Sequence, residues 1–154
     1  MTKEQFDKLS ILRRRYSEHN FMLQEAIAES AGLSVTDHKY LGLIIQKGKL
    51  TAGEAVKLTS LSSGAVTGLI DRLEKKKLVK RQFDKSDRRK VYIIPNLDKA
   101  KDLLGETFNQ TRIKMEKLFD NFTAEEIRAI EKYLIMTTEV MRETTDEVLA
   151  GHRK

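Results

Sequence analysis

Residues 61–79 run Leu-Ser-Ser-Gly-Ala-Val-Thr-Gly-Leu-Ile-Asp-Arg-Leu-Glu-Lys-Lys-Lys-Leu-Val. Ser62 is suited to cap a helix that extends from Ser63 to about Lys76. One face of this helix is apolar, because Val66, Ile70 and Leu73 recur at helical spacing with Leu69 beside them. The opposite face carries small or polar groups, namely Ser63, Thr67, Asp71 and Arg72. Such a face can approach a groove closely.

A second short helix precedes this one. Thr51-Ala52-Gly53-Glu54 is a capping box, and it predicts a helix with Ala55 and Leu58 facing inward. Residues 61–64 break that helix before the next one begins. Two short helices joined by a tight turn, the second polar on its outer face, predict a helix-turn-helix.

The residues that follow alternate with the period of a β-strand. Val79, Arg81 and Phe83 alternate with Lys80 and Gln82, and Val91 and Ile93 alternate within residues 90–94 until Pro95 ends the run. Residues 84–89, Asp-Lys-Ser-Asp-Arg-Arg, connect the two strands. A hairpin with a basic tip directly after the polar-faced helix is typical of a wing.

Helical patterns flank this central region. We expect a first helix from about Lys3 to about His19, continued or followed by a helical stretch from Phe21 to about Ser30, and a helix capped by Ser34 that stops before Gly48. Beyond Pro95 a seam steps by four and three residues, and a capping box at Thr123 begins a final helix to about Leu149; the seam consists of Leu104, Phe108, Thr111, Met115 and Leu118. Narrow apolar stripes on long helices require partners, so we expect a homodimer.

These patterns predict a mainly α fold with a small β-hairpin wing. We expect one domain over residues 1–154, with a winged helix-turn-helix lobe at 34–95 and a helical dimerisation lobe formed by 1–33 and 96–154.

Charge is concentrated in one segment. The chain has a net charge of +6, and residues 72–90 hold ten cations and three anions, a net +7 that leaves −1 for the rest. A basic stripe on a nearly neutral body is typical of a polyanion binder. The alternative is an ordinary solvated face, as most charge runs are.

Several classes of protein are disfavoured. The chain has no cysteine, which excludes disulfides, thiolate nucleophiles and cysteine-based sensing. It has no stretch that resembles a signal peptide or a membrane span, so we expect a cytoplasmic protein without membrane partners. His19, His38 and His152 lack metal-ligand spacing, so we expect neither a metal nor another cofactor. It has no phosphate-binding loop, dinucleotide fingerprint or nucleophile elbow, so we do not expect an enzyme.

The stretch from Leu61 to Val79 resembles the recognition helix of the MarR family (multiple antibiotic resistance regulators), and Asp84-x-x-Asp87-Arg88-Arg89 resembles that family's wing. The similarity covers 33–95 in sequence detail and the whole chain in layout. It implies an obligate dimer, palindromic operators and, often, release of DNA by a small anionic aromatic compound. Two departures stand out. Lys77 occupies a position where the family usually has Gly, and residues 94–98, Ile-Pro-Asn-Leu-Asp, replace Leu-Thr-x-x-Gly.

The resemblance assigns candidate DNA contacts. Small side chains on the recognition helix would read bases in the major groove, and wing arginines would enter the minor groove. The candidates are Ser62, Ser63, Gly64, Ala65, Thr67, Gly68, Arg72, Lys75, Asp87, Arg88, Arg89 and Lys90. The alternatives are helix capping for the first group and a solvated turn for the second.

Four aromatic or imidazole side chains are candidates for an effector pocket: Tyr16, His19, His38 and Tyr40. Such residues are more often simply part of a core or a surface.

We therefore expect a sequence-specific, double-stranded DNA-binding transcriptional regulator, a homodimeric repressor released by a small aromatic or anionic effector. Two alternatives stay open: a winged-helix module that binds a protein or RNA, and a non-specific chromosomal DNA binder.

Overall fold

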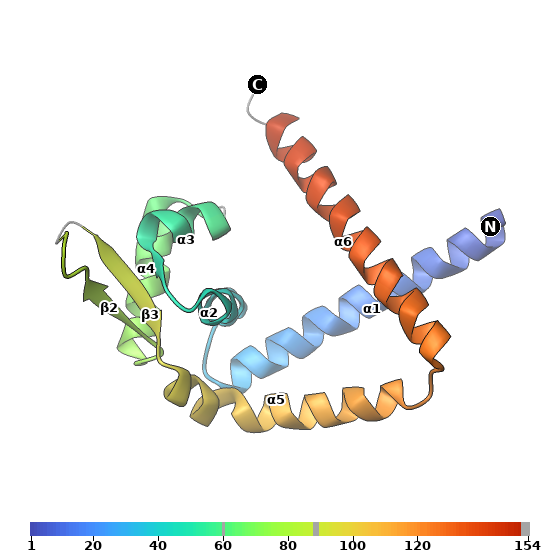
Figure 1. Cartoon of the computed structure of the whole chain (residues 1–154), viewed down its shortest axis with the longest axis horizontal. Helices are drawn as coiled ribbons and strands as arrows, with labels where there is room; N and C mark the ends of the chain where they lie inside the picture. The colour runs from blue at the N-terminus through green and yellow to red at the C-terminus, as the bar shows by residue number, and fades with distance from the viewer. Residues whose placement is uncertain (60, 88–89, 152–154) are drawn as a thin grey trace. The chain divides into compact units, whose positions relative to one another are not determined.

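The computed structural model describes residues 1–59, 61–87 and 90–151, so Arg88, Arg89 and His152 lie outside the described residues. The elements in chain order are α1 (Lys3–Ser30), α2 (Val35–Lys47), β1 (Leu50–Thr51), α3 (Ala52–Thr59), α4 (Ser63–Lys75), β2 (Val79–Phe83), β3 (Val91–Pro95), α5 (Leu97–Phe119) and α6 (Ala124–Gly151). The predicted fold class, mainly helical with a small sheet, is confirmed (Figure 1). Two compact units divide the chain, 1–108 and 109–154.

Local capping signals set most helix starts. The Ser34 and Ser62 hydroxyls accept backbone N–H groups three residues on, as predicted. Thr51 with Glu54, and Thr123 with Glu126, form complete reciprocal boxes. Hydrogen bonds from Thr51, first from its backbone and then from its hydroxyl, lower the pKa of Glu54. Each cap satisfies N–H groups that the first helical turn leaves without intrahelical partners.

The N-terminal helix is continuous. The two apolar stretches separated near Asn20 form the single helix α1, which ends at Ser30. Most of its length is exposed, and burial begins only at Ile27 and Ala28. The last turn of α1 therefore anchors the helix to the core of residues 1–108.

The sheet has one strand more than the predicted hairpin. Its order is β1-β3-β2, antiparallel throughout, with Leu50 opposite Ile93 and Arg81 opposite Ile93 on the other side. Leu50 is buried, so this two-residue strand covers the outer edge of β3 with an apolar side chain. The strand is too short to produce a recognisable alternation in sequence.

The core of residues 1–108 gathers the inner faces of α2 and α4 and one face of the sheet. Val66, Leu69, Ile70 and Leu73 are all buried, as the spacing in α4 predicted. The largest fully buried side chains are Leu41, Leu69, Ile70, Leu73, Leu78, Ile93 and Val66. Each such side chain contributes about 1.5–3 kcal/mol of transfer free energy. This packing fixes α4 against the sheet.

The turn after α4 depends on a left-handed residue. Lys77 has φ 61°, and the Leu78 and Lys77 amides donate to the Leu73 and Glu74 carbonyls, which is a Schellman motif. Lysine therefore adopts the conformation for which the family usually uses glycine, at a modest cost. Asn96 then donates to the Lys77 carbonyl and accepts from the Lys99 amide, so it caps α5.

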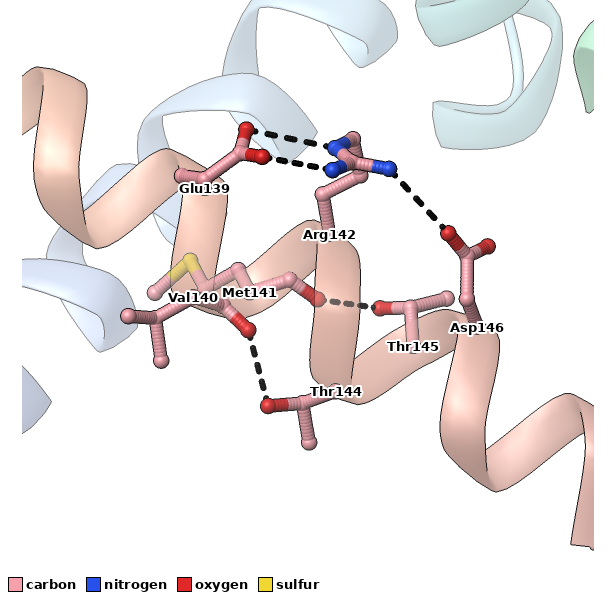
Figure 2. A network of polar contacts seen from close by, with 7 residues as sticks. All are labelled: Glu139, Val140, Met141, Arg142, Thr144, Thr145 and Asp146. Atoms are coloured by element: carbon pink, nitrogen blue, oxygen red, sulfur yellow. Dashed lines mark hydrogen bonds and ion pairs between the residues drawn. The ribbon is translucent and has the colours of Figure 1, made fainter.

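Residues 109–154 contain the end of α5 and helix α6. On one face of α6 the Arg142 guanidinium joins Glu139 and Asp146, and elsewhere on the helix the hydroxyls of Thr144 and Thr145 donate to carbonyls one turn back (Figure 2). Exposed apolar side chains recur along the same helix, among them Leu134, Met141 and Val148. Within the described residues, no side chain of α6 is buried.

Across the described part of the chain, no helix combines the length and apolar character needed to cross a membrane.

Candidate nucleic-acid interface

The outer face of α4 is built from small, exposed residues. Ser63, Gly64, Ala65 and Thr67 are all exposed, whereas Val66 between them is buried. The Thr67 hydroxyl donates to the Ser63 carbonyl at 3.0 Å, which uses its one donor and leaves its oxygen able to accept a hydrogen bond. The first two turns of α4 therefore present a shallow surface that can enter a major groove.

Arg72 is held by a buried carboxylate. Its Nε and Nη2 donate to both oxygens of Asp37 on α2, at 2.7–3.2 Å. The side chain of Asp37 is 6% exposed and that of Arg72 is 55% exposed. The hydrogen bonds that Arg72 donates to Asp37 raise the pKa of Arg72. The carboxylate of Asp37 ties α2 to α4 through these bonds, a role that the sequence analysis missed.

A second cluster joins α4 to strand β2. The Arg81 amide donates to Glu74 at 2.9 Å, and its guanidinium binds Asp71 at 2.6 Å and also contacts Glu74. Hydrogen bonding to Asp71, and then to Glu74, raises the pKa of Arg81. The sequence analysis did not select Arg81 as a site residue. Its hydrogen bonds connect helix α4 to strand β2 of the wing.

The base of the wing is ordered by Asp84. Its Oδ1 accepts from the Ser86 hydroxyl and amide and from the Asp87 amide, at 2.6–3.0 Å. These hydrogen bonds, that of the Ser86 hydroxyl foremost, lower the pKa of Asp84 to about 2. The Asp84 amide donates to the Lys90 carbonyl and the Lys90 amide donates to the Asp87 carbonyl, so both sides of the tip are bridged.

The remaining candidate DNA contacts have different surroundings. Ser62, Lys75 and Lys90 are exposed, whereas Gly68 and Asp87 are half-buried. A Cβ at Gly68 would lie 3.4 Å from Nη1 of Arg72, which is ordinary van der Waals contact. Arg88 and Arg89, the predicted wing arginines, fall outside the described residues.

A pocket of about 550 Å³ lies among α1, α2 and the first half of α5. Its walls are mostly apolar, with Phe21 and Phe108 as aromatic groups and Asn20 and Gln24 as polar ones. The His38 ring lines it, stacked with Phe108 at 6.0 Å between centroids. His38 is 7% exposed, and its Nδ1 has no hydrogen-bond partner among the described residues. Desolvation lowers the pKa of His38, which favours the neutral ring at pH 7.

Of the four predicted effector residues, His38 is the one that lines this pocket. Tyr16 and His19 are exposed on α1, and a ring nitrogen of His19 lies 2.9 Å from the Arg15 carbonyl. Tyr40 is buried in the core and donates to the Thr59 carbonyl. Sequence reasoning missed two aromatic lining residues, Phe21 and Phe108, the second of which it had placed in the seam of α5.

Among the residues described, no three His, Cys, Asp or Glu side chains are grouped to hold a metal ion.

Helix α4 has a polar outer face and is followed by the β2–β3 hairpin, and β1 completes the sheet. This arrangement defines a winged helix-turn-helix DNA-binding protein. The family model for the MarR family matches residues 31–90. The HTH-type transcriptional regulator YcgE of Bacillus subtilis (strain 168) is 32% identical over 148 residues, which cover 96% of each chain. The chain therefore belongs to the MarR family of transcriptional regulators.

Solved structures show the same fold. A MarR family protein from Bacillus stearothermophilus superposes with a TM-score of 0.73 at 23% identity, covering 92% of this chain and 99% of that one. A point mutant of S. aureus MepR, solved bound to an oligodeoxyribonucleotide, superposes with a TM-score of 0.61 at 24% identity, covering 86% of this chain and 97% of that one.

Proposed function

We propose that this MarR-family regulator represses transcription as a homodimer that binds a palindromic operator. Its α4 helices would read the major groove and its wings would contact the adjacent minor groove. The observation that carries the proposal is the exposed small-residue face of Ser63, Ala65 and Thr67, on a helix that the Arg72–Asp37 hydrogen bonds tie to α2. The net +7 of residues 72–90 supplies the phosphate contacts.

The homodimer is supported by apolar side chains exposed on two long helices. In residues 1–108, helix α1 exposes Phe6, Leu9 and Leu12. In residues 109–154, α6 exposes Leu134 and Met141. Two equal half-sites in the DNA follow from a twofold dimer, with centres about one helical turn apart.

We further propose that the pocket lined by His38 and Phe108 takes the effector, a small ring compound. The pocket volume of about 550 Å³ suits a ligand of that size. Its aromatic and apolar walls favour a planar ligand, and the neutral imidazole offers a hydrogen-bonding group. Because the chain has no cysteine, the effector cannot act by modifying a thiol of this protein.

Gly42 provides a test of the pocket. It lies on α2 and lines the pocket, and a Cβ there would meet nothing within 4 Å. Gly42→Leu should therefore fill the pocket while raising helix propensity by about 1 kcal/mol. In thermal-shift titrations with salicylate and benzamide, wild type should be stabilised by at least one compound and Gly42→Leu by neither. Equal stabilisation of both proteins would place the ligand elsewhere, and no response of the wild type to either would count against a ring-binding pocket.

The DNA-binding proposal is tested by enrichment. Purified protein is incubated with random-sequence duplexes, and the retained DNA is sequenced. We expect a palindromic motif whose affinity falls roughly a thousandfold or more between 50 and 200 mM salt for ~6–10 phosphate contacts. Retention without a shared motif would favour the non-specific chromosomal binder. Absence of duplex binding would favour the interaction module.

A further inference from the structure

Strand β2 carries one large apolar side chain that the core does not take up. Phe83 is 65% exposed at the end of β2, in a strand whose other exposed residues are Lys80, Arg81 and Gln82. An isolated exposed phenylalanine is not unusual by itself. Phe83 is of interest because of its position relative to α4.

The register of the sheet shows which way Phe83 faces. Side chains alternate along a strand, so Val79, Arg81 and Phe83 share one face. Val79 is buried in the core and Arg81 bonds Asp71 and Glu74 of α4. Phe83 therefore lies on the face of β2 that is turned toward α4.

The contacts of Arg81 show which part of α4 lies beside the middle of β2. Its backbone bonds Glu74, near the end of α4, and its guanidinium reaches Asp71, about one turn closer to the start of the helix. Two further residues along β2 extend the strand by about 6.6 Å in the direction of the wing tip. Phe83 thus lies at the wing end of β2, on the strand face turned toward α4.

We propose that Phe83 is a DNA contact that packs against apolar atoms of the duplex, a thymine methyl or a deoxyribose, between the groove read by α4 and the groove reached by the wing. The inference rests on the proposed use of α4 and the wing. DNA is the occupant that fits, because Phe83 belongs to the segment 72–90, which carries a net charge of +7. The lysines and arginines of this segment would bind DNA phosphates. Between the phosphates a duplex also exposes apolar groups, the thymine methyls and the deoxyribose carbons, which an aromatic ring can cover.

An apolar contact has a signature that a charged one lacks. It displaces no counterion, so its loss lowers affinity and leaves the slope of log affinity against log salt unchanged. The loss of a lysine contact lowers both. Lys85, exposed in the wing turn, is the matched charged residue, and Leu97, 59% exposed at the start of α5, is the matched apolar residue outside this surface.

The experiment measures binding of fluorescent duplexes by anisotropy at five salt concentrations, with the best sequence enriched by the wild type. Phe83→Ala should weaken binding about tenfold with an unchanged salt slope and an unchanged unfolding temperature. Phe83→Leu should recover most of the affinity, and Leu97→Ala should bind like wild type. Lys85→Ala should reduce the slope.

Replacing thymines singly by deoxyuridine then distinguishes the two sources of apolar atoms. If one substitution weakens the wild type but not Phe83→Ala, the contact is a thymine methyl; if none does, it is a deoxyribose. Phe83→Ala binding within twofold of wild type, or losing salt slope, overturns the inference while leaving the DNA-binding proposal intact. Failure of the wild type to select any duplex overturns both.

Discussion

At the scale of single residues, Asp37 and Arg72 form a pair with unequal members. The carboxylate is almost fully buried and the guanidinium is half in solvent, although three hydrogen bonds join them. Removal of the exposed member leaves a buried charge unpaired, whereas removal of the buried charge leaves a guanidinium that water can solvate. Replacing Arg72 should therefore cost more stability than replacing Asp37.

We predict that Arg72→Met lowers the free energy of unfolding by about 2–4 kcal/mol and Asp37→Asn by about 1 kcal/mol. Chemical denaturation of the two variants and the wild type measures both values. Equal losses, or a larger loss for Asp37→Asn, would contradict the assignment of the carboxylate as the buried partner.

His38 adds a pH dependence to stability. Burial lowers its pKa from the ordinary 6.5, so the unfolded chain takes up a proton at higher pH than the folded one. The stabilisation by the neutral ring is complete above pH 6.5 and is lost as the pH falls through the lowered folded value. Between pH 7.5 and 5.5, wild type should therefore lose more thermal stability than His38→Gln. Identical losses in the two proteins would show that His38 does not titrate differently on folding.

At the scale of elements, the wing depends on a single carboxylate. Asp84→Ala removes acceptors from the Ser86 and Asp87 amides while changing no cation. We predict weaker operator binding, by about three- to tenfold, because a less ordered tip must be fixed when DNA binds. Asp84→Asn, which keeps an acceptor oxygen, should retain most of the affinity. Binding of Asp84→Ala at wild-type strength would mean that the turn is not needed.

Elements with local signals could be predicted from sequence, and those made by distant contacts could not. The helices after Ser34, Thr51, Ser62 and Thr123 begin where their caps indicated, because a cap involves residues three apart. The contact of Asp37 with Arg72 joins residues 35 apart, and no local pattern links two positions so distant in sequence. Strand β1 forms because β3 offers an open edge to Leu50, which a two-residue segment cannot signal.

The site divides in the same way. The outer face of α4 follows from periodicity, and the structure has it exposed. The pocket follows from how α1, α2 and the first half of α5 approach one another. Of the four candidates only His38 lines it, and Phe21 and Phe108 were not among the candidates. Tyr40 was indistinguishable in sequence from a pocket residue, and its bond to Thr59 places it in the core.

At the scale of the whole molecule, we expect homodimerisation to bury the apolar side chains that are exposed on the long helices of one chain. Sedimentation at micromolar concentration should give twice the chain mass of 17.7 kDa. Leu134→Lys places a charge in the exposed apolar stripe of α6 and should shift the protein toward monomer, since an unpaired charge is costly to bury. Arg142→Ala, on the ion-paired face in Figure 2, is the matched control and should leave the mass unchanged. A monomeric wild type would contradict the homodimer.

The central claim is that the small-residue face of α4 reads the operator. The measurement that tests it most directly is the sequence motif enriched from random duplexes by the wild type, by Thr67→Ala and by Ala65→Gln. Both residues are exposed on α4, so neither change should disturb folding. We predict that base preference changes at the central positions of each half-site, with a loss of about 1–3 kcal/mol on the wild-type operator, while binding to unselected DNA is kept. An unchanged motif for both variants would show that α4 is not the reading helix.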